Sequence, residues 1–283
     1  MTYDPTLELI DLALREDLAQ GDITSEATVP ADRQATAVML AKQNGVISGL
    51  ETAQAVFARV DPTVDFEPLV TDGDRVTSGT ELARIKGNAR SILSAERTAL
   101  NLIQRLSGIA TITAEYVAKV DGTGASVIDT RKTTPGMRYL EKTAVRHGGG
   151  SNHRFNLGDA ILIKDNHLAA IGGSHSVRDA VTAAKRRAPH TSRVEVEVVD
   201  LAGVREALDA HADIIMLDNM SPDEMREAVK LVDGRALVEA SGGITLETIR
   251  DVAETGVDLI SAGALTHSAP SLDISLDFAL DQS

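Results

Sequence analysis

The sequence predicts an α/β protein in which a hairpin-rich N-terminal region is followed by alternating strands and helices. Before about residue 108, apolar and polar residues alternate around Asp-Gly and Ser-Gly turns, which is the pattern of β-hairpins. After residue 126, short apolar runs alternate with amphipathic segments of helical period. The midpoints of four runs, at Val196, Leu217, Val238 and Ile260, lie 21, 21 and 22 residues apart. This is the spacing of β/α units, so we expect a parallel sheet that closes as a barrel.

The N-terminal region begins with a predicted helix over residues 7–19, where apolar side chains recur every three or four positions. A turn is predicted at Gly21-Asp22-Ile23-Thr24, and strands are predicted over residues 36–42 and 65–70. Further hairpin turns are predicted between residues 70 and 85, at Asp-Gly and Ser-Gly pairs. We interpret the region as a packed β-rich domain.

Residues 91–119 have the apolar spacing of helices, with Gly108 as an interruption. We therefore predict two consecutive helices joined at Ser107-Gly108. The start of a later helix is marked by Ser221, Pro222 and Glu224, which form a capping-box sequence. The strands predicted after residue 120 cover residues 126–128, 160–163, 194–198, 213–217, 236–238 and 258–260, and the helices cover residues 177–187, 201–210, 223–232 and 246–255.

Composition excludes several classes of protein. The 283 residues suffice for one large or two ordinary domains, and the longest apolar runs are far shorter than the ~18 residues of a membrane span. No basic segment followed by an apolar one opens the chain, so we expect no secretory signal and a cytoplasmic location. The absence of cysteine excludes disulfides, thiolate zinc sites, iron–sulfur clusters and cysteine nucleophiles.

The net charge of -14 disfavours nucleic-acid binding, because the chain repels a polyanion unless basic residues are concentrated locally. Aromatic stacking platforms for single strands are also scarce, with four Phe, three Tyr and no Trp. The acidity has two interpretations that the sequence leaves open. It could simply keep the protein soluble, or it could be an adaptation to high salt.

Polar or glycine residues follow every predicted strand of the parallel sheet. In β/α barrels the functional groups lie at these carboxyl ends, because the βα loops emerge there on one face. The combination of cations, carboxylates and glycines at these ends predicts an enzyme. The residues at the ends are Asp129-Thr130-Arg131-Lys132, Lys164-Asp165-Asn166-His167, Glu197, Asp218-Asn219, Glu239-Ala240-Ser241-Gly242-Gly243 and Ser261-Ala262-Gly263-Ala264.

Cations are concentrated between residues 131 and 164, where only Glu141 and Asp159 are acidic. In a chain of net charge -14 this concentration predicts an anionic ligand, and arginine pairs bidentately with carboxylate or phosphate. The alternative is a solvated basic patch or a surface that binds a partner. The basic residues and histidines of this segment are Arg131, Lys132, Arg138, Lys142, Arg146, His147, His153, Arg154 and Lys164.

The ends of the last two predicted strands, Ser241-Gly242-Gly243 and Gly263-Ala264, indicate a phosphate site. Barrels bind phosphate at this place through backbone amides, and glycine lets the backbone approach the anion closely. Ordinary glycine turns are the alternative.

Two carboxylates, Glu197 and Asp218, stand 21 residues apart on neighbouring predicted strands. They could hold sugar hydroxyls or a hydrated Mg²⁺, or they could form ion pairs with Arg131 or Lys164. The histidines show no zinc-binding spacing, so we expect no zinc site.

Together these residues resemble the quinolinate phosphoribosyltransferases, the family of decarboxylating nicotinate-nucleotide pyrophosphorylases of NAD biosynthesis. The resemblance extends over nearly the whole chain, and the motifs occur in the family's order. The most specific motifs are Glu96-Arg97-Thr98-Ala99-Leu100-Asn101, Asp129-Thr130-Arg131-Lys132-Thr133-Thr134-Pro135-Gly136, Gly148-Gly149-Gly150-Ser151-Asn152-His153-Arg154, Leu162-Ile163-Lys164-Asp165-Asn166-His167, Glu195-Val196-Glu197-Val198, Leu217-Asp218-Asn219 and Ser241-Gly242-Gly243-Ile244.

The resemblance implies an N-terminal α/β sandwich domain over residues 1–107, completed by the C-terminal tail 268–283, and an open seven-stranded α/β barrel over residues 108–267. It also implies a homo-oligomer, a dimer or a hexamer, in which Arg97 enters the active site of the neighbouring subunit. The implied substrate-binding residues are Arg97, Arg131, Lys132, His153, Arg154 and Lys164, with Glu197 and Asp218 at the ribose hydroxyls and Mg²⁺, and Ser241, Gly242, Gly243, Gly263 and His267 at the 5′-phosphate.

The implied reaction transfers a phosphoribosyl group from phosphoribosyl pyrophosphate to quinolinate with loss of CO₂, and Mg²⁺ is the implied cofactor. Catalytic roles are implied for Lys132, Lys164, Glu197 and Asp218, and no nucleic-acid or membrane partner is expected. Three alternatives stay open. Lys164 could form a Schiff base as in aldolases, nicotinate could be the acceptor, or the protein could bind phosphoribosyl ligands without catalysis.

Overall fold

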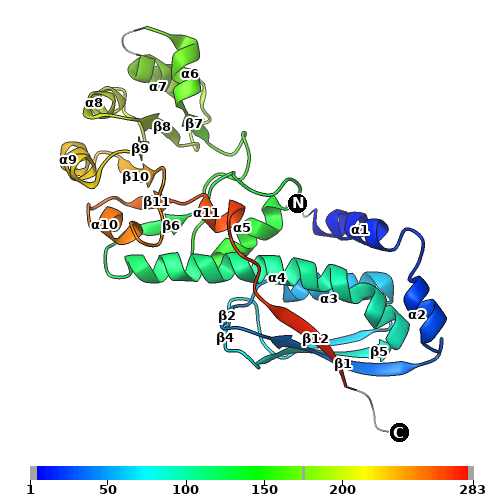
Figure 1. The fold of residues 1–283 in the computed structure, drawn as a ribbon. Helices are drawn as coiled ribbons and strands as arrows, with labels where there is room; N and C mark the ends of the chain where they lie inside the picture. The colour runs from blue at the N-terminus through cyan, green and yellow to red at the C-terminus, as the bar shows by residue number, and fades with distance from the viewer. Residues whose placement is uncertain (1–4, 174–175, 280–283) are drawn as a thin grey trace. The chain divides into compact units, whose positions relative to one another are not determined.

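The computed structural model describes residues 5–173 and 176–279, which divide into two compact units (Figure 1). The first unit contains the residues up to Ala114, Thr133–Gly149 and the residues from Thr266 onward. The second contains Glu115–Lys132 and Gly150–Leu265. The sheet of the first unit is antiparallel and that of the second is parallel, which confirms the predicted α/β class.

The first unit is built on a four-stranded sheet with the order β12-β1-β5-β3. Alternate residues of its long strand β1 are buried, as expected for a strand with one face against a core. The core on this face includes Met39, Phe57, Ile85 and Ile92, which are almost completely buried. The strands of this unit are β1 (Gln34–Ala41), β3 (Asp65–Pro68), β5 (Glu81–Asn88) and β12 (Ile274–Ala279), and a separate pair is formed by β2 (Gly45–Val46) and β4 (Arg75–Val76).

Helices α1 and α3 pack against each other in this unit. Helix α1 begins and ends close to the predicted bounds, whereas α3 was not predicted. The helices are α1 (Thr6–Asp17), α2 (Ile23–Thr28), α3 (Leu50–Val60), α5 (Arg138–His147) and the first part of α4 (Ala89–Val120), and the short helix α11 (Ala264–His267) spans the last boundary between the units.

Helix α4 is continuous through Gly108, so the prediction of two helices joined at Ser107-Gly108 is wrong. The glycine has another purpose. A Cβ at position 108 would lie 1.9 Å from the carbonyl oxygen of Pro270, closer than any real contact. Gly108 therefore allows the chain around Pro270 to cross the helix, and the apolar face continues past it, with Ile103 and Ile109 both fully buried.

Helix α5 was missed because its buried face carries charged residues. Glu141 is fully buried and accepts hydrogen bonds from the Arg105 guanidinium at 2.9 Å and from the Thr134 backbone N–H at 3.0 Å. Lys142 is also buried. A search for apolar periodicity treats such positions as exposed, so the pattern fails where charged groups are paired inside the protein.

The predicted turn at residues 21–24 instead contains the start of helix α2. Asp22 is the N-cap residue, and its carboxylate accepts hydrogen bonds from the Ser25 N–H at 2.9 Å and the Ser25 hydroxyl at 2.5 Å. These hydrogen bonds from Ser25 lower the pKa of Asp22. A six-residue helix is too short to show an apolar period, so only this N-cap could have indicated it.

We expect Asp22→Ala to destabilise the first unit by about 1 kcal/mol at neutral pH, because the helix loses its N-cap acceptor. The lowered pKa of Asp22 means that its ionised form stabilises the fold above the ordinary aspartate pKa. This stabilisation is lost as the pH falls through the lowered pKa. Thermal unfolding of the native protein and the variant should therefore differ at pH 7 and converge in acid. A difference that is as large at pH 2 would contradict this assignment.

The second unit is built on a parallel sheet of six strands with the order β6-β11-β10-β9-β8-β7. Each strand lies within about three residues of its predicted position. The predicted capping box at Ser221 and Glu224 is confirmed at the start of α9. The strands are β6 (Ser126–Ile128), β7 (Ile161–Ile163), β8 (Val194–Val198), β9 (Ile214–Asp218), β10 (Leu237–Ser241) and β11 (Leu259–Ser261), and the helices are α6 (Asp165–Ile171), α7 (Ser176–Arg187), α8 (Leu201–Asp209), α9 (Pro222–Val232) and α10 (Ile249–Ala253).

The seventh position of the expected barrel is a single residue rather than a strand. Ser151 forms an isolated parallel bridge with Ile128, on the side of β6 away from β11. Within residues 5–173 and 176–279 no pairing joins this position to β7, at the other edge of the sheet, so the sheet is open there. The chain just after Ser151 therefore lies beside the carboxyl end of β6.

In the described parts of the chain, no helix has both the length and the apolar character needed to cross a bilayer. The cytoplasmic location expected from the sequence stays a prediction.

Candidate active site

The candidate site lies at the carboxyl ends of the parallel strands in the second unit. Asp218, the last residue of β9, is in register with Ser241, the last residue of β10. Glu197 lies one residue before the end of β8, and Lys164 directly follows β7. The strand ends thus bring the predicted carboxylates, lysine and glycine turn to one edge of the sheet, as expected for an α/β barrel.

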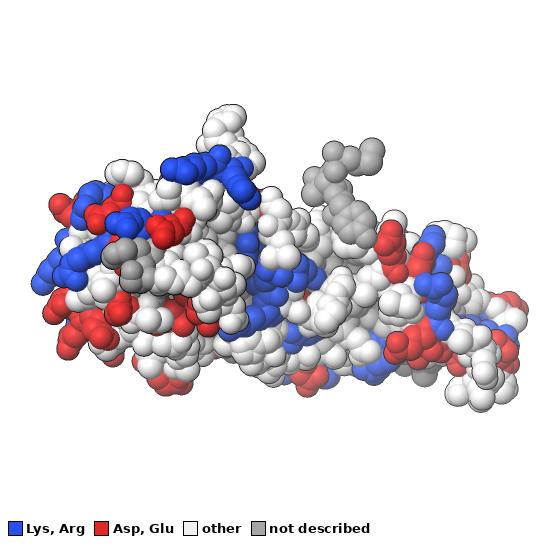
Figure 2. All heavy atoms as spheres, turned by 90° about the horizontal axis from the view of Figure 1, so that it is seen from above, with Lys and Arg blue, Asp and Glu red and all other residues white. Residues whose placement is uncertain are grey.

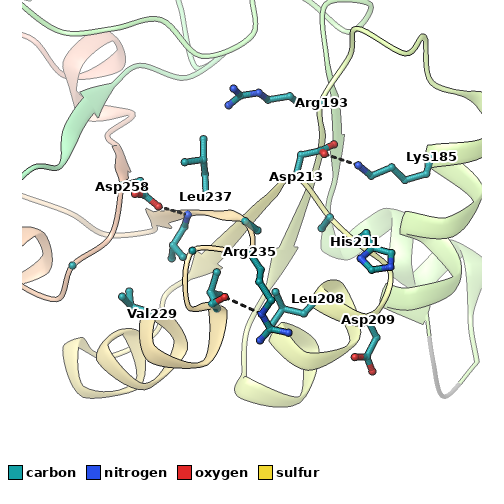
Figure 3. A pocket seen from close by; sticks show the side chains of 16 residues that line it. Lys185, Arg193, Leu208, Asp209, His211, Asp213, Val229, Arg235, Leu237 and Asp258 are labelled. Atoms are coloured by element: carbon teal, nitrogen blue, oxygen red, sulfur yellow. Dashed lines mark hydrogen bonds and ion pairs between the residues drawn. The ribbon is translucent and has the colours of Figure 1, made fainter.

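The opposite ends of the strands border a hollow of about 1150 Å³, lined in part by charged residues (Figure 3). These charges hold the strands in place. Lys185 pairs with Asp213 at 2.5 Å, and Asp213 and Asp258 accept backbone N–H groups of β8 and β10. Arg235 binds carbonyl groups at the end of α9. In barrels this end serves stability, so we do not place the reaction there.

Two arginines lie together at the functional edge. Burial and the nearby charge of Arg131 both lower the pKa of Arg154. The Nε atoms of both residues are buried and have no hydrogen-bond partner within residues 5–173 and 176–279. A pair of half-buried guanidinium groups, each with a buried Nε that no described residue accepts from, is suited to a ligand that carries two adjacent carboxylates. On the face shown in Figure 2, Lys and Arg side chains gather in one group with few acids among them, while both kinds are mixed elsewhere.

The segment that contains Arg154 is held by the carboxylate of Asp129, which directly follows β6 and is fully buried. This carboxylate accepts hydrogen bonds from the side-chain amide of Asn152 at 2.6 Å and from the backbone N–H of His153 at 2.8 Å. Arg154 itself donates from Nη1 to the carbonyl of Ala160 at 3.0 Å. The Asn-His-Arg sequence is therefore fixed to the end of β6 before any ligand binds.

A second group of polar residues includes His153, next to Arg154 in the chain, and two buried glutamates on strands of the sheet. His153 Nε2 is 3.1 Å from Glu195 Oε2 and 3.8 Å from Glu239 Oε2. Burial and the neighbouring Glu195 carboxylate raise the pKa of Glu239 well above its ordinary value. Neither glutamate was predicted as a site residue, although Glu239 was among the polar residues at the strand ends and Glu195 was part of a family motif. A further signal for Glu239 was its place within an apolar strand, where burying a charged group costs free energy.

Lys164 and Glu197 form an ion pair, with Nζ 3.1 Å from Oε2. This confirms one of the two interpretations of Glu197, without removing the other, because a carboxylate has a second oxygen. Asp218 accepts a hydrogen bond from the side-chain amide of Asn219 at 2.8 Å. Two carboxylates with oxygens to spare on neighbouring strands fit the way proteins hold Mg²⁺, through few carboxylates together with substrate oxygens.

The glycine turn after β10 packs closely on the turn after β9. A Cβ on Gly242 would lie 2.4 Å from Asn219 Oδ1, and the φ angle of Gly242 is +95°. The Asn219 N–H also donates to the Ser241 carbonyl at 3.0 Å. Gly242 is thus required by its neighbour as well as by its backbone angle, so its presence alone does not demonstrate a phosphate site.

The structure does not bring all predicted site residues into one unit. The exposed residues Arg97, on α4, and His267, at the end of α11, belong to the first unit. Lys132 is exposed in the second unit, and Gly263 follows β11 there. The predicted site residues that share the second unit are Arg131, Lys132, His153, Arg154, Lys164, Glu197, Asp218, Ser241, Gly242, Gly243 and Gly263.

Comparison with known proteins agrees with this arrangement. The family model for the N-terminal domain of quinolinate phosphoribosyl transferase matches residues 22–107, and the model for the C-terminal domain matches residues 109–277. The nicotinate-nucleotide pyrophosphorylase of Mycobacterium leprae is 46% identical, over 97% of this chain and 98% of its own. A probable nicotinate-nucleotide pyrophosphorylase of Bacillus subtilis is 45% identical, over 96% of this chain and 93% of its own.

A solved structure of the nicotinate-nucleotide pyrophosphorylase from Francisella tularensis superimposes with a TM-score of 0.92. It is 39% identical in sequence and covers 99% of this chain and 98% of its own. The family models together match most of the chain, and the relatives match it nearly from end to end. The chain belongs to the quinolinate phosphoribosyl transferase family.

Proposed function

We propose that this protein transfers the phosphoribosyl group of phosphoribosyl pyrophosphate to quinolinate and releases CO₂, which yields nicotinate mononucleotide and pyrophosphate for NAD biosynthesis. The observation that carries the proposal is the pair of half-buried guanidinium groups of Arg131 and Arg154, whose Nε atoms are buried and have no hydrogen-bond partner within the described residues. Quinolinate has two adjacent carboxylates, which such a pair can bind through parallel hydrogen bonds. Relatives named for this reaction at 44–46% identity support the same conclusion.

The first step forms a bond between the quinolinate ring nitrogen and C1 of the ribose, while the bond from C1 to pyrophosphate breaks. Pyrophosphate leaves with the electron pair of that bond, and positive charge develops on the ribose. The proposed roles of Glu197 and Asp218 are to contact the ribose hydroxyls and stabilise this charge, and Lys132 and Lys164 bind the anionic groups. Positioning and electrostatic stabilisation thus supply most of the catalysis.

The second step breaks the bond between C2 of the ring and its carboxylate. CO₂ leaves, the electron pair stays on C2, and a proton from solvent replaces the lost group. The quaternary ring nitrogen formed in the first step stabilises the carbanion, so no covalent bond to the protein is needed. The ion pair of Lys164 with Glu197 also argues against a Schiff-base lysine, because that role needs an uncharged amine.

Glu197 and Asp218 would hold Mg²⁺ together with oxygens of the substrate. The ion would neutralise charge on the pyrophosphate. Ser241, Gly242, Gly243 and Gly263 are proposed to border the 5′-phosphate, together with His267.

The proposed assembly is a homo-oligomer, a dimer or a hexamer, in which Arg97 enters the site of a neighbouring subunit. Its exposure on α4 is compatible with this role. We propose that residues 1–107 and 268–283 form the N-terminal domain and that residues 108–267 form the barrel domain. Sedimentation of the purified protein tests the assembly, and mixing Arg97→Ala with Lys164→Ala subunits tests the shared site, because mixed oligomers should regain activity.

The reaction is tested with the purified protein, quinolinate, phosphoribosyl pyrophosphate and Mg²⁺, at low and at molar KCl. We expect nicotinate mononucleotide and CO₂ in equal amounts. Product from nicotinate without CO₂ would instead identify nicotinate as the acceptor. Binding of both substrates without turnover would identify a ligand-binding protein. A rate that rises with KCl supports adaptation to high salt, and a rate that falls supports the simpler interpretation of the acidic surface.

A further inference from the structure

The interior of the parallel sheet contains two buried glutamates for which the proposed reaction has no role. Glu195 is on β8 and Glu239 is on β10, with β9 between them. They are 4% and 1% exposed. Glu195 Oε1 and both carboxylate oxygens of Glu239 accept no hydrogen bond of ordinary geometry within the described residues, although Ser261 and Glu195 lie close enough to Glu239 to act on its pKa. Buried carboxylates of this kind are costly, so their presence in the sheet calls for a compensating partner.

The partner they share is His153, and the hydrogen bonds of its ring define where the ring proton is. Nδ1 accepts the backbone N–H of Arg154 at 2.7 Å, so Nδ1 carries a lone pair rather than a proton. The ring proton is therefore on Nε2, which is 3.1 Å from Glu195 Oε2 and 3.8 Å from Glu239 Oε2. The imidazole faces the Glu195 carboxylate within hydrogen-bond distance on one side, with Glu239 farther away, and accepts from the main chain of Arg154 on the other.

This arrangement connects strands that are not neighbours in the sheet. Asp129, at the end of β6, holds the backbone of His153 from one side. On the other side, Glu195 of β8 lies 3.1 Å from Nε2 of its ring, and Glu239 of β10 lies 3.8 Å from the same atom. The segment that carries Arg154 is thus fixed through the backbone of His153 and through its ring. Both contacts limit where the Arg154 guanidinium can lie.

The charge of Glu195 has a second effect. Arg131 and Arg154 repel each other, and this repulsion acts on the pKa of Arg154 in the same direction as burial does. The Glu195 carboxylate acts in the opposite direction on Arg154. The buried negative charge therefore helps two guanidinium groups to stay side by side before a substrate anion arrives.

We propose that Glu195 and Glu239 are positioning residues, which act through the His153 ring to hold Arg154 opposite Arg131 in the quinolinate pocket. This proposal rests on the proposed function for the identity of the ligand. Neither glutamate touches the substrate in this scheme. Their removal should weaken the binding of quinolinate far more than that of phosphoribosyl pyrophosphate.

The same three side chains could be considered as a metal site, because their donor atoms lie within 4.8 Å of one another. The ring geometry argues against it. A metal at Nε2 would need the ring proton on Nδ1, and Nδ1 already accepts the Arg154 N–H. A metal is therefore an outcome that would overturn the proposal.

The test compares Glu195→Gln, Glu195→Ala and Glu239→Ala with Glu227→Gln and Glu227→Ala, which make the same substitutions at an exposed position of α9. We expect each interior variant to raise the KM for quinolinate at least 10-fold, with the KM for phosphoribosyl pyrophosphate and kcat within about 3-fold of the native values. Both Glu227 variants should behave as the native protein. Glu195→Gln keeps the shape and an acceptor oxygen, so it remains informative if Glu195→Ala does not fold.

Equal changes in both KM values, or no change in either, would overturn the proposal. A second measurement needs no substrate. Nitrogen-15 NMR of the histidine rings should show His153 with its proton on Nε2, and Glu195→Ala should alter this signal. Two results would contradict the proposed positioning role: a ring proton on Nδ1, or binding of one equivalent of a divalent metal that is lost in Glu239→Ala. If the native protein has the expected tautomer but does not turn over quinolinate, the proposed function fails and the ring geometry stands.

Discussion

Arg131→Ala is expected to lower kcat/KM for quinolinate by about 10²- to 10³-fold, because truncating one partner of a buried charged contact costs about 3–4 kcal/mol. Arg131 is half-buried, and its Nε is buried and unpaired within the described part of the chain, so this donor is already shielded from water before the ligand binds. The substitution removes that donor together with the charge that would meet the substrate anion. Steady-state kinetics with quinolinate as the varied substrate measure the effect.

The fold should survive this substitution. Without a ligand, Arg131 and Arg154 repel each other, so the melting temperature of the variant should equal or slightly exceed that of the native protein. Arg187→Ala, at the exposed end of α7, is the matched control and should keep native kinetics. Unchanged kinetics in both Arg131→Ala and Arg154→Ala would remove these two residues from the pocket.

Gly108→Ala has the largest expected effect on stability. Helix propensity alone favours alanine over glycine by about 1 kcal/mol in a helix interior. The added Cβ would, however, lie 1.9 Å from the Pro270 carbonyl oxygen and 3.1 Å from Ser271 Cα. Backbone cannot move away as a side chain can, so we expect a net loss of about 3 kcal/mol and a melting temperature lower by roughly 10 °C.

Thermal unfolding followed by circular dichroism measures this loss. Gly158→Ala is the control, because its Cβ would meet only Asn156 Oδ1, at 3.4 Å. A Gly108→Ala variant that is more stable than the native protein would show that propensity outweighs the close contact, and would contradict our account of why α4 contains this glycine.

The parallel strands were predictable because each is a short apolar run at a regular distance from the next. The continuous helix α4 was not, because glycine has two uses that a sequence does not separate: ending a helix and allowing another chain to come close. Gly108 has the second use, and its partner Pro270 is more than 150 residues away in the sequence. Helix α5 was hidden because Glu141 and Lys142 are buried, contrary to what their charge suggests.

Some features of the candidate site could likewise be predicted from the sequence, and others could not. The concentration of cations between residues 131 and 164 predicted an anionic ligand at this segment, because an acidic chain has few reasons to gather positive charge, but it did not show which of the cations lie together. Glu195 was not predicted as a site residue, since Glu195 and Glu197 alternate with valines, as in a strand with one face in solvent. In a sheet that curves around its own interior, that second face is enclosed. Only the arrangement of the strands shows which glutamate is buried.

The pairing of β12 with β1 has a consequence for how the polypeptide is made. Strand β12 covers Ile274–Ala279, and its pairing with β1 runs from Thr36 opposite Ala279 to Ala41 opposite Ile274. A ribosome makes the two strands more than 200 residues apart, so β1 leaves the exit tunnel long before its neighbour exists. Until then one edge of β1 is open to other chains. Completion of the first sheet must therefore wait until residues 274–279 have been translated, and the nascent chain is vulnerable to aggregation throughout that interval.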